Sequence, residues 1–306
     1  MDNFTLGTTF FLMGFSDVRE IQILHAVLFL VIYLAAVLGN LLIIILISKD
    51  HRLHTPMYYF LKNLSFLDLC FISITVPKSI ANSVTNHNTI SFLGCVSQVL
   101  FLFLLATAEI ILLTVMSYDR YVAICHPLQY DIVMNRRTCV QMTASSWVTG
   151  GLNAILHTAA TFSVPMCGPP DIHQFFCDVP QLLSLACSYN IGELVVIGIS
   201  FVLDIACFVF IDISYINIFS TVLRLPSREG RSKVFSTCLP HLIVVTLFLS
   251  SGFFDYSHPL PKSPTTSDLL LSTFYIVVPP TMNPFIYTLR NKDMKTALRR
   301  LLMNRY

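Results

Sequence analysis

The feature that most constrains this chain is a series of seven apolar stretches, each long enough to cross a bilayer as a helix. A hydrocarbon core of about 30 Å needs roughly 20 apolar residues of helix. Of the 306 residues, 55% are hydrophobic and only 12% are charged, whereas soluble domains carry about 25% charged residues. The mean hydropathy is +0.70. We therefore predict membrane helices over about Ile23–Ile47, Met57–Ser79, Phe92–Ile124, Val140–Ser163, Leu194–Leu223, Val234–Tyr256 and Leu269–Leu289.

Basic residues are distributed unevenly between the loops that join these stretches. If residues 1–22 form an extracellular tail, only Arg19, Lys78 and Lys262 of the 19 Lys and Arg residues lie outside. Such an excess on the inner side follows the positive-inside rule and predicts a cytoplasmic C-terminus. No internal repeat or linker divides residues 1–306, so we expect a single domain. The net charge of +2 gives no reason to expect nucleic acid as a partner.

Both ends of the chain carry recognisable signals. Asn3-Phe4-Thr5 is an acceptor for N-glycosylation on the side that reaches the lumen. Residues 290–306 predict a short amphipathic helix on the anionic inner leaflet. Its basic face lies opposite an apolar face made of Met294, Leu298, Leu301 and Leu302.

Two carboxylates, Asp68 and Glu109, lie near mid-membrane depth on the second and third stretches. An isolated ionised carboxylate there is very costly, so each must be protonated, paired or bound to a metal. Asn40 and Asn283 lie at a comparable depth on the first and seventh stretches. These side chains predict a polar pocket that could hold Na⁺ through oxygen ligands; the alternative is that the carboxyl groups are protonated and hydrogen-bonded. We expect no other cofactor.

Four of the nine cysteines are expected on the oxidising outer side: Cys95, Cys167, Cys177 and Cys187. The last three lie in a loop of about 30 residues, and a loop of that length is usually functional or cross-linked. Four cysteines allow three pairings, and their spacing does not choose among them. A zinc site is the alternative, although the spacing lacks the CxxC or HxxxH pattern typical of zinc.

The triplet Asp119–Arg120–Tyr121 ends the third stretch, where lipid gives way to water. Burying a charge near lipid costs several kcal/mol unless it is paired or solvated, so this arginine has a role. The triplet belongs to M-S-Y-D-R-Y-V-A-I-C-H-P-L-Q-Y, which begins at Met116. Three further motifs are L-H-T-P-M-Y-Y-F-L-K-N-L-S-F-L-D-L-C from Leu53, S-K-V-F-S-T-C-L-P-H-L from Ser232 and P-P-T-M-N-P-F-I-Y-T-L-R-N from Pro279. Together they resemble odorant receptors, a branch of the rhodopsin-like receptors.

This resemblance implies an all-α membrane fold, a seven-transmembrane helix bundle with a short C-terminal helix. It implies the disulfides Cys95–Cys177 and Cys167–Cys187, and it favours Asp68 and Glu109 as the anionic ligands of Na⁺. It also implies a switch in which Asp119 restrains Arg120 at rest. On activation the sixth helix swings outward and the arginine turns towards two tyrosines. The residues of this switch and of the kink in the seventh helix are Asp119, Arg120, Tyr121, Tyr215, Asn283, Pro284 and Tyr287.

The ligand site is expected on the outer side of the polar pocket. Most of its residues are apolar or aromatic, which suits a small hydrophobic molecule with one polar group; interhelical packing is the alternative role for each. Two departures from the family pattern are Leu249, where a tyrosine is common, and Asp204 with Asp212 in the fifth helix. The expected lining residues are Leu102, Phe103, Ala106, Thr107, Ser200, Leu203, Asp204, Phe253, Tyr256 and Tyr275.

The function implied is that of an odorant receptor in the plasma membrane, which binds a small hydrophobic odorant. Its partner would be a stimulatory, olfactory-type G protein that raises cyclic AMP. A receptor for a non-volatile metabolite is the second hypothesis. A transporter or intramembrane enzyme is the third, but it predicts inverted repeats, paired broken helices or a nucleophile–base pair, none of which is visible. Retinal binding would need a lysine within Leu269–Leu289, and that stretch has none. We therefore do not expect an enzyme.

Overall fold

The computed structural model of the chain describes residues 9–13, 18–187, 191–224, 228–257 and 266–303. Within these ranges, only the backbone is described at 228, 229, 233, 251–257, 266–272, 289 and 290.

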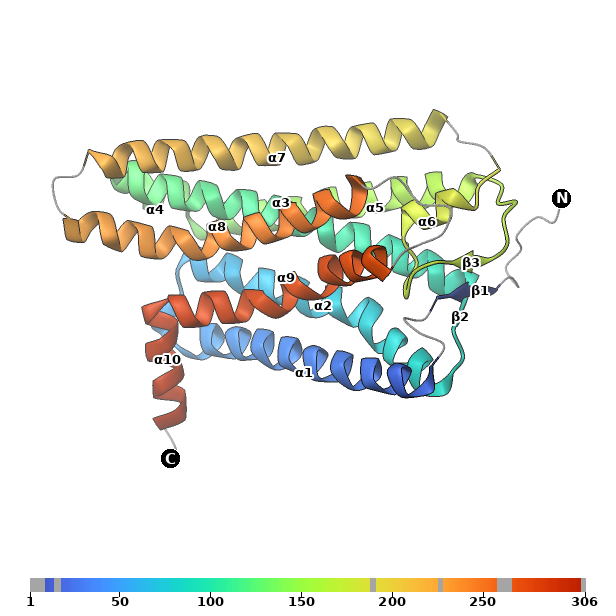
Figure 1. Cartoon of the computed structure of the whole chain (residues 1–306). Helices are drawn as coiled ribbons and strands as arrows, with labels where there is room; N and C mark the ends of the chain where they lie inside the picture. The colour runs from blue at the N-terminus through green and yellow to red at the C-terminus, as the bar shows by residue number, and fades with distance from the viewer. Residues whose placement is uncertain (1–8, 14–17, 188–190, 225–227, 258–265, 304–306) are drawn as a thin grey trace.

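In the part of the chain that the structure describes, seven long helices form a bundle, which confirms the predicted fold (Figure 1). Each extends beyond the predicted apolar stretch at one or both ends, by one residue in α3 and by up to six in α2 and α8, because a helix continues into the polar layer once it has crossed the hydrocarbon. A further helix, α10, crosses one end of the bundle (Figure 1). The helices are α1 (Arg19–Lys49), α2 (Pro56–Thr85), α3 (Phe92–Cys125), α5 (Arg136–Ser163), α7 (Ile191–Leu223), α8 (Arg228–Ser257), α9 (Thr266–Arg290) and α10 (Lys292–Met303).

Helix α3 is the central helix of the bundle and contacts α2, α5, α7 and α8. It has no internal proline, and the Ser91 side chain caps its start by accepting a hydrogen bond from the Gly94 N–H at 3.1 Å. In its most apolar stretch 56% of the residues are buried, against 17% in α7. Residues placed along α3 therefore reach most of the other helices.

The end of the bundle opposite α10 carries a small three-stranded sheet that the sequence did not predict (Figure 1). Strand β1 (Thr9–Leu12) lies in the middle, antiparallel to β2 (Thr89–Ser91) and parallel to β3 (Asp171–Ile172). Its side chains alternate, so that Phe10 and Leu12 are buried while Phe11 is exposed. The chain before α1 therefore folds back over the helices. We call this end the sheet end.

Two disulfides lie at the sheet end and join the pairs that the resemblance implied. Cys95–Cys177 ties the start of α3 to the loop before α7, and both residues are fully buried in a cluster with Phe10 and Leu12. Cys167–Cys187 closes a loop within that segment, and both residues are exposed.

Gln98 fixes the same loop from within α3. Its side-chain oxygen accepts the Cys177 N–H at 3.0 Å, and its side-chain nitrogen donates to the Ile74 carbonyl at 3.1 Å. Ile74 precedes Pro77, a proline inside α2 that interrupts the backbone hydrogen bonds of the helix. One buried amide therefore joins α2, α3 and the loop.

Three short helical segments lie at the α10 end among the described residues: the 3₁₀ turns His51–Leu53 and Pro127–Gln129, and α4 (Tyr130–Val133). Here α10 differs in part from the expectation of a helix lying only on lipid. Met294 and Ala297 are buried against the bundle, whereas Leu302, near the end of the same apolar face, is exposed. Arg300 also binds Asp50 at 3.1 Å, which anchors α10 to the end of α1.

The two disulfides differ in what their loss should cost. In the chain-entropy model a disulfide across 82 residues stabilises by about 4–5 kcal/mol and one across 20 residues by about 3 kcal/mol. We predict that Cys95→Ser or Cys177→Ser retains the protein in the endoplasmic reticulum, while Cys167→Ser is less severe. Surface labelling of tagged variants measures this, and equal surface levels for Cys95→Ser and the unmodified chain would contradict it.

Candidate functional site

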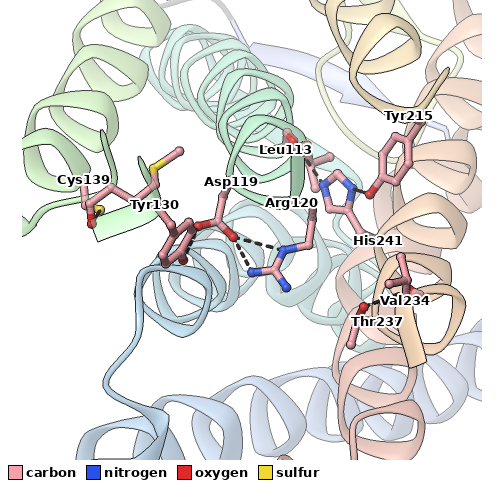
Figure 2. Close-up of polar contacts among 10 residues, drawn as sticks. Leu113, Asp119, Arg120, Tyr130, Cys139, Tyr215, Val234, Thr237 and His241 are labelled. Carbon is pink, nitrogen blue, oxygen red and sulfur yellow. Dashed lines mark hydrogen bonds and ion pairs between the residues drawn. The ribbon is translucent and has the colours of Figure 1, made fainter. Parts of the chain in front are cut away.

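The charge pair Asp119–Arg120 lies at the α10 end of α3 (Figure 2). Arg120 donates from Nε to Asp119 Oδ2 at 3.0 Å, and its Nη2 contacts the same oxygen. The side chains are only 14% and 1% exposed, so both charges depend on each other for compensation. Among the described residues no acidic side chain of another helix forms an ion pair with Arg120. The restraint on the arginine is therefore local to α3.

Tyr130 of α4 holds the other oxygen of the aspartate (Figure 2). Its hydroxyl donates to Asp119 Oδ1 at 2.8 Å. Burial raises the pKa of Tyr130, and the charge of Asp119 raises it further, so the hydroxyl keeps the proton that it donates. This bond couples the segment after α3 to the charge pair. Tyr121 lies apart from the pair, with its hydroxyl 3.0 Å from His126 Nε2.

His241 of α8 separates Arg120 from its expected partner Tyr215 (Figure 2). His241 Nε2 lies 3.1 Å from the Leu113 carbonyl, which can only accept, so this nitrogen donates. In the neutral ring Nδ1 then accepts from the Tyr215 hydroxyl at 2.7 Å. The Tyr287 hydroxyl is buried without a hydrogen-bond partner among the described residues. Tyr215 and Tyr287 are the two tyrosines towards which Arg120 is expected to turn. Among the described residues, Tyr215 is already bonded to His241, whereas the Tyr287 hydroxyl has no partner.

The deep polar pocket forms where α1, α2, α3 and α9 approach one another. Asn283 Nδ2 donates to both carboxylate oxygens of Asp68, at 3.1 and 3.0 Å. Asn40 donates to the Pro280 carbonyl at 2.9 Å, and this is the carbonyl that Pro284 leaves without its helical donor. Glu109 is buried and close enough to Asp68 for an electrostatic interaction. The structure therefore brings the four predicted residues together.

Three buried oxygens in this pocket have no hydrogen-bond donor among the described residues: Glu109 Oε1, Asn40 Oδ1 and Asn283 Oδ1. Carboxylate and amide oxygens are the ligands that hard cations prefer. A buried acceptor without a donor is costly, so a cation here would satisfy groups that the protein leaves unpaired. These oxygen atoms are ligands of the kind that fit Na⁺.

A chain of polar side chains runs between α3, α5 and α7, closer to the sheet end. Asn153 Nδ2 donates to Thr107 Oγ1 at 2.9 Å, and Ser200 donates to Asn153 Oδ1 at 2.7 Å. His157 Nε2 lies 2.6 Å from Ser200 Oγ, and the His157 ring stacks on Phe103 with centroids 4.0 Å apart. We call Thr107, Asn153, Ser200 and His157 the polar chain.

The other expected ligand residues lie around the polar chain with varied exposure. Leu102 is buried, while Ala106, Leu203 and Tyr275 are partly buried and pack against the core. Asp204 is exposed, and none of the hydrogen bonds of the polar chain reaches it. The side chains of Phe253 and Tyr256 lie outside the described residues.

Three functional candidates were missed in the sequence: Asn153, His157 and His241. Each is a buried polar or ionisable residue inside a membrane helix, and such residues are rare and usually functional. That signal was available for His241, which stands within the motif from Ser232. In α5 it was obscured, because this helix contains many Ser, Thr and Gly residues.

Comparison with known proteins decides the family. A family model for olfactory receptors matches residues 29–305. The chain belongs to the olfactory receptor family. It is thus a multi-pass membrane receptor of the G-protein-coupled class and not an enzyme.

Human relatives match this olfactory receptor over nearly its whole length. It is 58% identical to human olfactory receptor 14A16, with 99% of this chain and 98% of the relative covered. It is 56% identical to human olfactory receptor 14J1, with 99% of this chain and 94% of that relative covered. The crystal structure of squid rhodopsin superposes with a TM-score of 0.76 over 94% of this chain and 87% of that chain. At 19% identity this likeness shows the shared fold alone.

The polar chain of the receptor depends on a close approach of α5 to α3 at Gly150. A Cβ at this position would lie 2.6 Å from the Leu104 carbonyl oxygen, whereas one at Gly151 would meet nothing within 4 Å. We predict that Gly150→Ala destabilises the receptor by about 1–3 kcal/mol, as overpacking typically does. The melting temperature of the detergent-purified protein measures this, with Gly151→Ala as the matched control. Equal melting of the two variants would contradict the prediction.

Proposed function

We propose that this olfactory receptor binds a small hydrophobic odorant near the polar chain and activates a stimulatory, olfactory-type G protein, which raises cyclic AMP. The observation that carries the proposal is the position of Arg120. It is a nearly buried cation that, among the described residues, is held only by the side chain of Asp119. It lies beside α8, a helix that contacts α3 through His241. A helix that moves can release such a cation.

The proposed orientation places the α10 end in the cytoplasm and the sheet end outside. Most Lys and Arg residues are at the α10 end, in agreement with the positive-inside rule. The two disulfides lie at the sheet end, which suits an oxidising compartment. Asn3, the proposed glycosylation site, lies outside the described residues but precedes β1, which belongs to that end.

The proposed ligand site suits an odorant because its lining is apolar around a few polar groups. Phe103 and Leu102 present aromatic and aliphatic surface on α3, and Thr107 and Ser200 present hydroxyls. Burial of the carbon skeleton supplies most of the affinity, and a hydrogen bond orients it.

The proposed G-protein contact includes the segment after α3. Leu128 is 96% exposed and Ile132 is 75% exposed, four residues apart. Tyr130, between them, bonds Asp119. Exposed apolar side chains at the end of a membrane protein that faces the cytoplasm suit a protein partner.

The test of the function is a cyclic AMP assay in cells that express the receptor, with a broad panel of volatile odorants. A dose-dependent rise that vector-transfected cells lack supports the proposal. Absence of any response at confirmed surface expression would overturn it.

Loss of the arginine tests the proposed switch. We predict that Arg120→Ala reaches the cell surface but abolishes the agonist-stimulated rise in cyclic AMP, because no cation remains to be released. Arg136→Ala is the matched control, since Arg136 is exposed at the same end, and it should signal normally. Full signalling by surface-expressed Arg120→Ala would refute the switch.

We also propose that Asp68 and Glu109, with the free amide oxygens of Asn40 and Asn283, hold a structural Na⁺. An ion at ten times its Kd stabilises the state that binds it by about 1.4 kcal/mol. We predict a higher melting temperature of purified receptor in sodium chloride than in N-methyl-D-glucamine chloride, and no such difference for Asp68→Asn or Glu109→Gln. Identical melting of the unmodified receptor in both salts would exclude the site.

A further inference from the structure

The hydrogen bonds of the polar chain have a direction. A serine has one hydroxyl proton, and Ser200 donates it to Asn153 Oδ1. Ser200 must therefore accept from His157, so His157 carries its proton on Nε2 in this contact. At the other side of Asn153, its Nδ2 donates to Thr107 Oγ1. The protons of these three hydrogen bonds are thus directed from His157 to Ser200, from Ser200 to Asn153, and from Asn153 to Thr107.

The end of the chain at Thr107 is a donor without an acceptor. Thr107 accepts from Asn153, and its own hydroxyl proton has no partner among the described residues. Thr114 uses its hydroxyl proton on the Ile110 carbonyl at 2.8 Å, whereas the buried hydroxyls of Thr75, Thr143 and Thr158 have no partner among the described residues. Thr107 is only 7% exposed, so water reaches it poorly. A buried donor that makes no hydrogen bond destabilises the folded protein.

The surroundings of Thr107 restrict what can satisfy this donor. Its neighbours on α3 are apolar, and Phe103 covers the face of the His157 ring. Asp204 of α7 is exposed and outside the chain. A ligand in this region finds a hydroxyl donor and apolar surface.

We infer that Thr107 recognises the functional group of the ligand and selects hydrogen-bond acceptors: aldehydes, ketones and esters. This inference rests on the proposed function and specifies the ligand class of the same site. A carbonyl oxygen accepts the Thr107 proton and completes the polar chain. An alkane of equal length leaves the Thr107 hydroxyl without a hydrogen bond. An ammonium group has only donors, so it cannot accept the Thr107 proton.

The test compares probes on one carbon skeleton: octanal, 2-octanone, n-octylamine and octane. We expect the two carbonyl compounds to be more potent than the amine and the alkane in the cyclic AMP assay. Thr107→Val should lower carbonyl potency roughly tenfold, as loss of one buried hydrogen bond does. Thr107→Ser keeps the hydroxyl and should stay within about threefold. Thr246→Val is the matched control, because that exposed hydroxyl bonds the Leu242 carbonyl of its own helix at 2.8 Å, and the potency of the carbonyl compounds should not change.

Thr107→Val also removes the acceptor of Asn153, so surface expression is matched for every variant. If it does not reach the surface, Thr107→Cys replaces it, since a thiol is only a weak donor and should lower carbonyl potency in the same direction. Higher potency of the amine than of the carbonyl compounds would overturn the inference, because the chain would then end in an acceptor. Unchanged carbonyl potency in Thr107→Val, or in Thr107→Cys where that variant replaces it, would overturn it as well. A receptor that answers other odorants in the broad panel but neither carbonyl probe would overturn the inference and leave the proposed function standing. Silence to the whole panel would overturn both.

Discussion

The contact between Arg120 and Asp119 is the interaction on which the α10 end of the receptor depends. Two nearly buried charges next to each other in sequence compensate one another, and no charged side chain of another helix forms an ion pair with either of them among the described residues. A buried pair of this kind contributes little net stability, but removing one partner leaves an uncompensated charge. Tyr130 completes the shell of the aspartate. The pair therefore serves as a restraint that other helices can break without being part of it.

Helix α3 carries this restraint and also contributes residues to the loop contacts, the polar chain and the deep pocket. Cys95 and Gln98 fix the loop at the sheet end, Thr107 ends the polar chain, and Glu109 faces the deep pocket. Because one helix of 34 residues holds all of them, a small shift of α3 is felt at each site. Ligand binding beside Thr107 and release of Arg120 are thus events on one rigid element.

The sequence predicted the helices and the central charge pair well, because lipid imposes long apolar runs and makes each buried charge conspicuous. It did not predict the sheet, since β1 and β2 are three or four residues long and pair only in the folded protein. The polar chain was not predicted: Thr107 and Ser200 were expected to line a ligand site, and Asn153 and His157 in the polar α5 were not singled out. Contacts between helices of this kind depend on how the helices rotate, and a single sequence does not specify that rotation. The expectation for Asp204 also depended on such a rotation, and the structure leaves that side chain exposed.

The most direct test of this account is the position of the Arg120 guanidinium in an active complex. The measurement is a cryo-electron microscopy structure of the receptor with an agonist and a nucleotide-free G protein. The account predicts that Arg120 has left Asp119 and lies within hydrogen-bond distance of the Tyr215 hydroxyl, and that His241 no longer bonds Tyr215. A complex in which Arg120 still contacts Asp119, with the Tyr215–His241 bond intact, would contradict it.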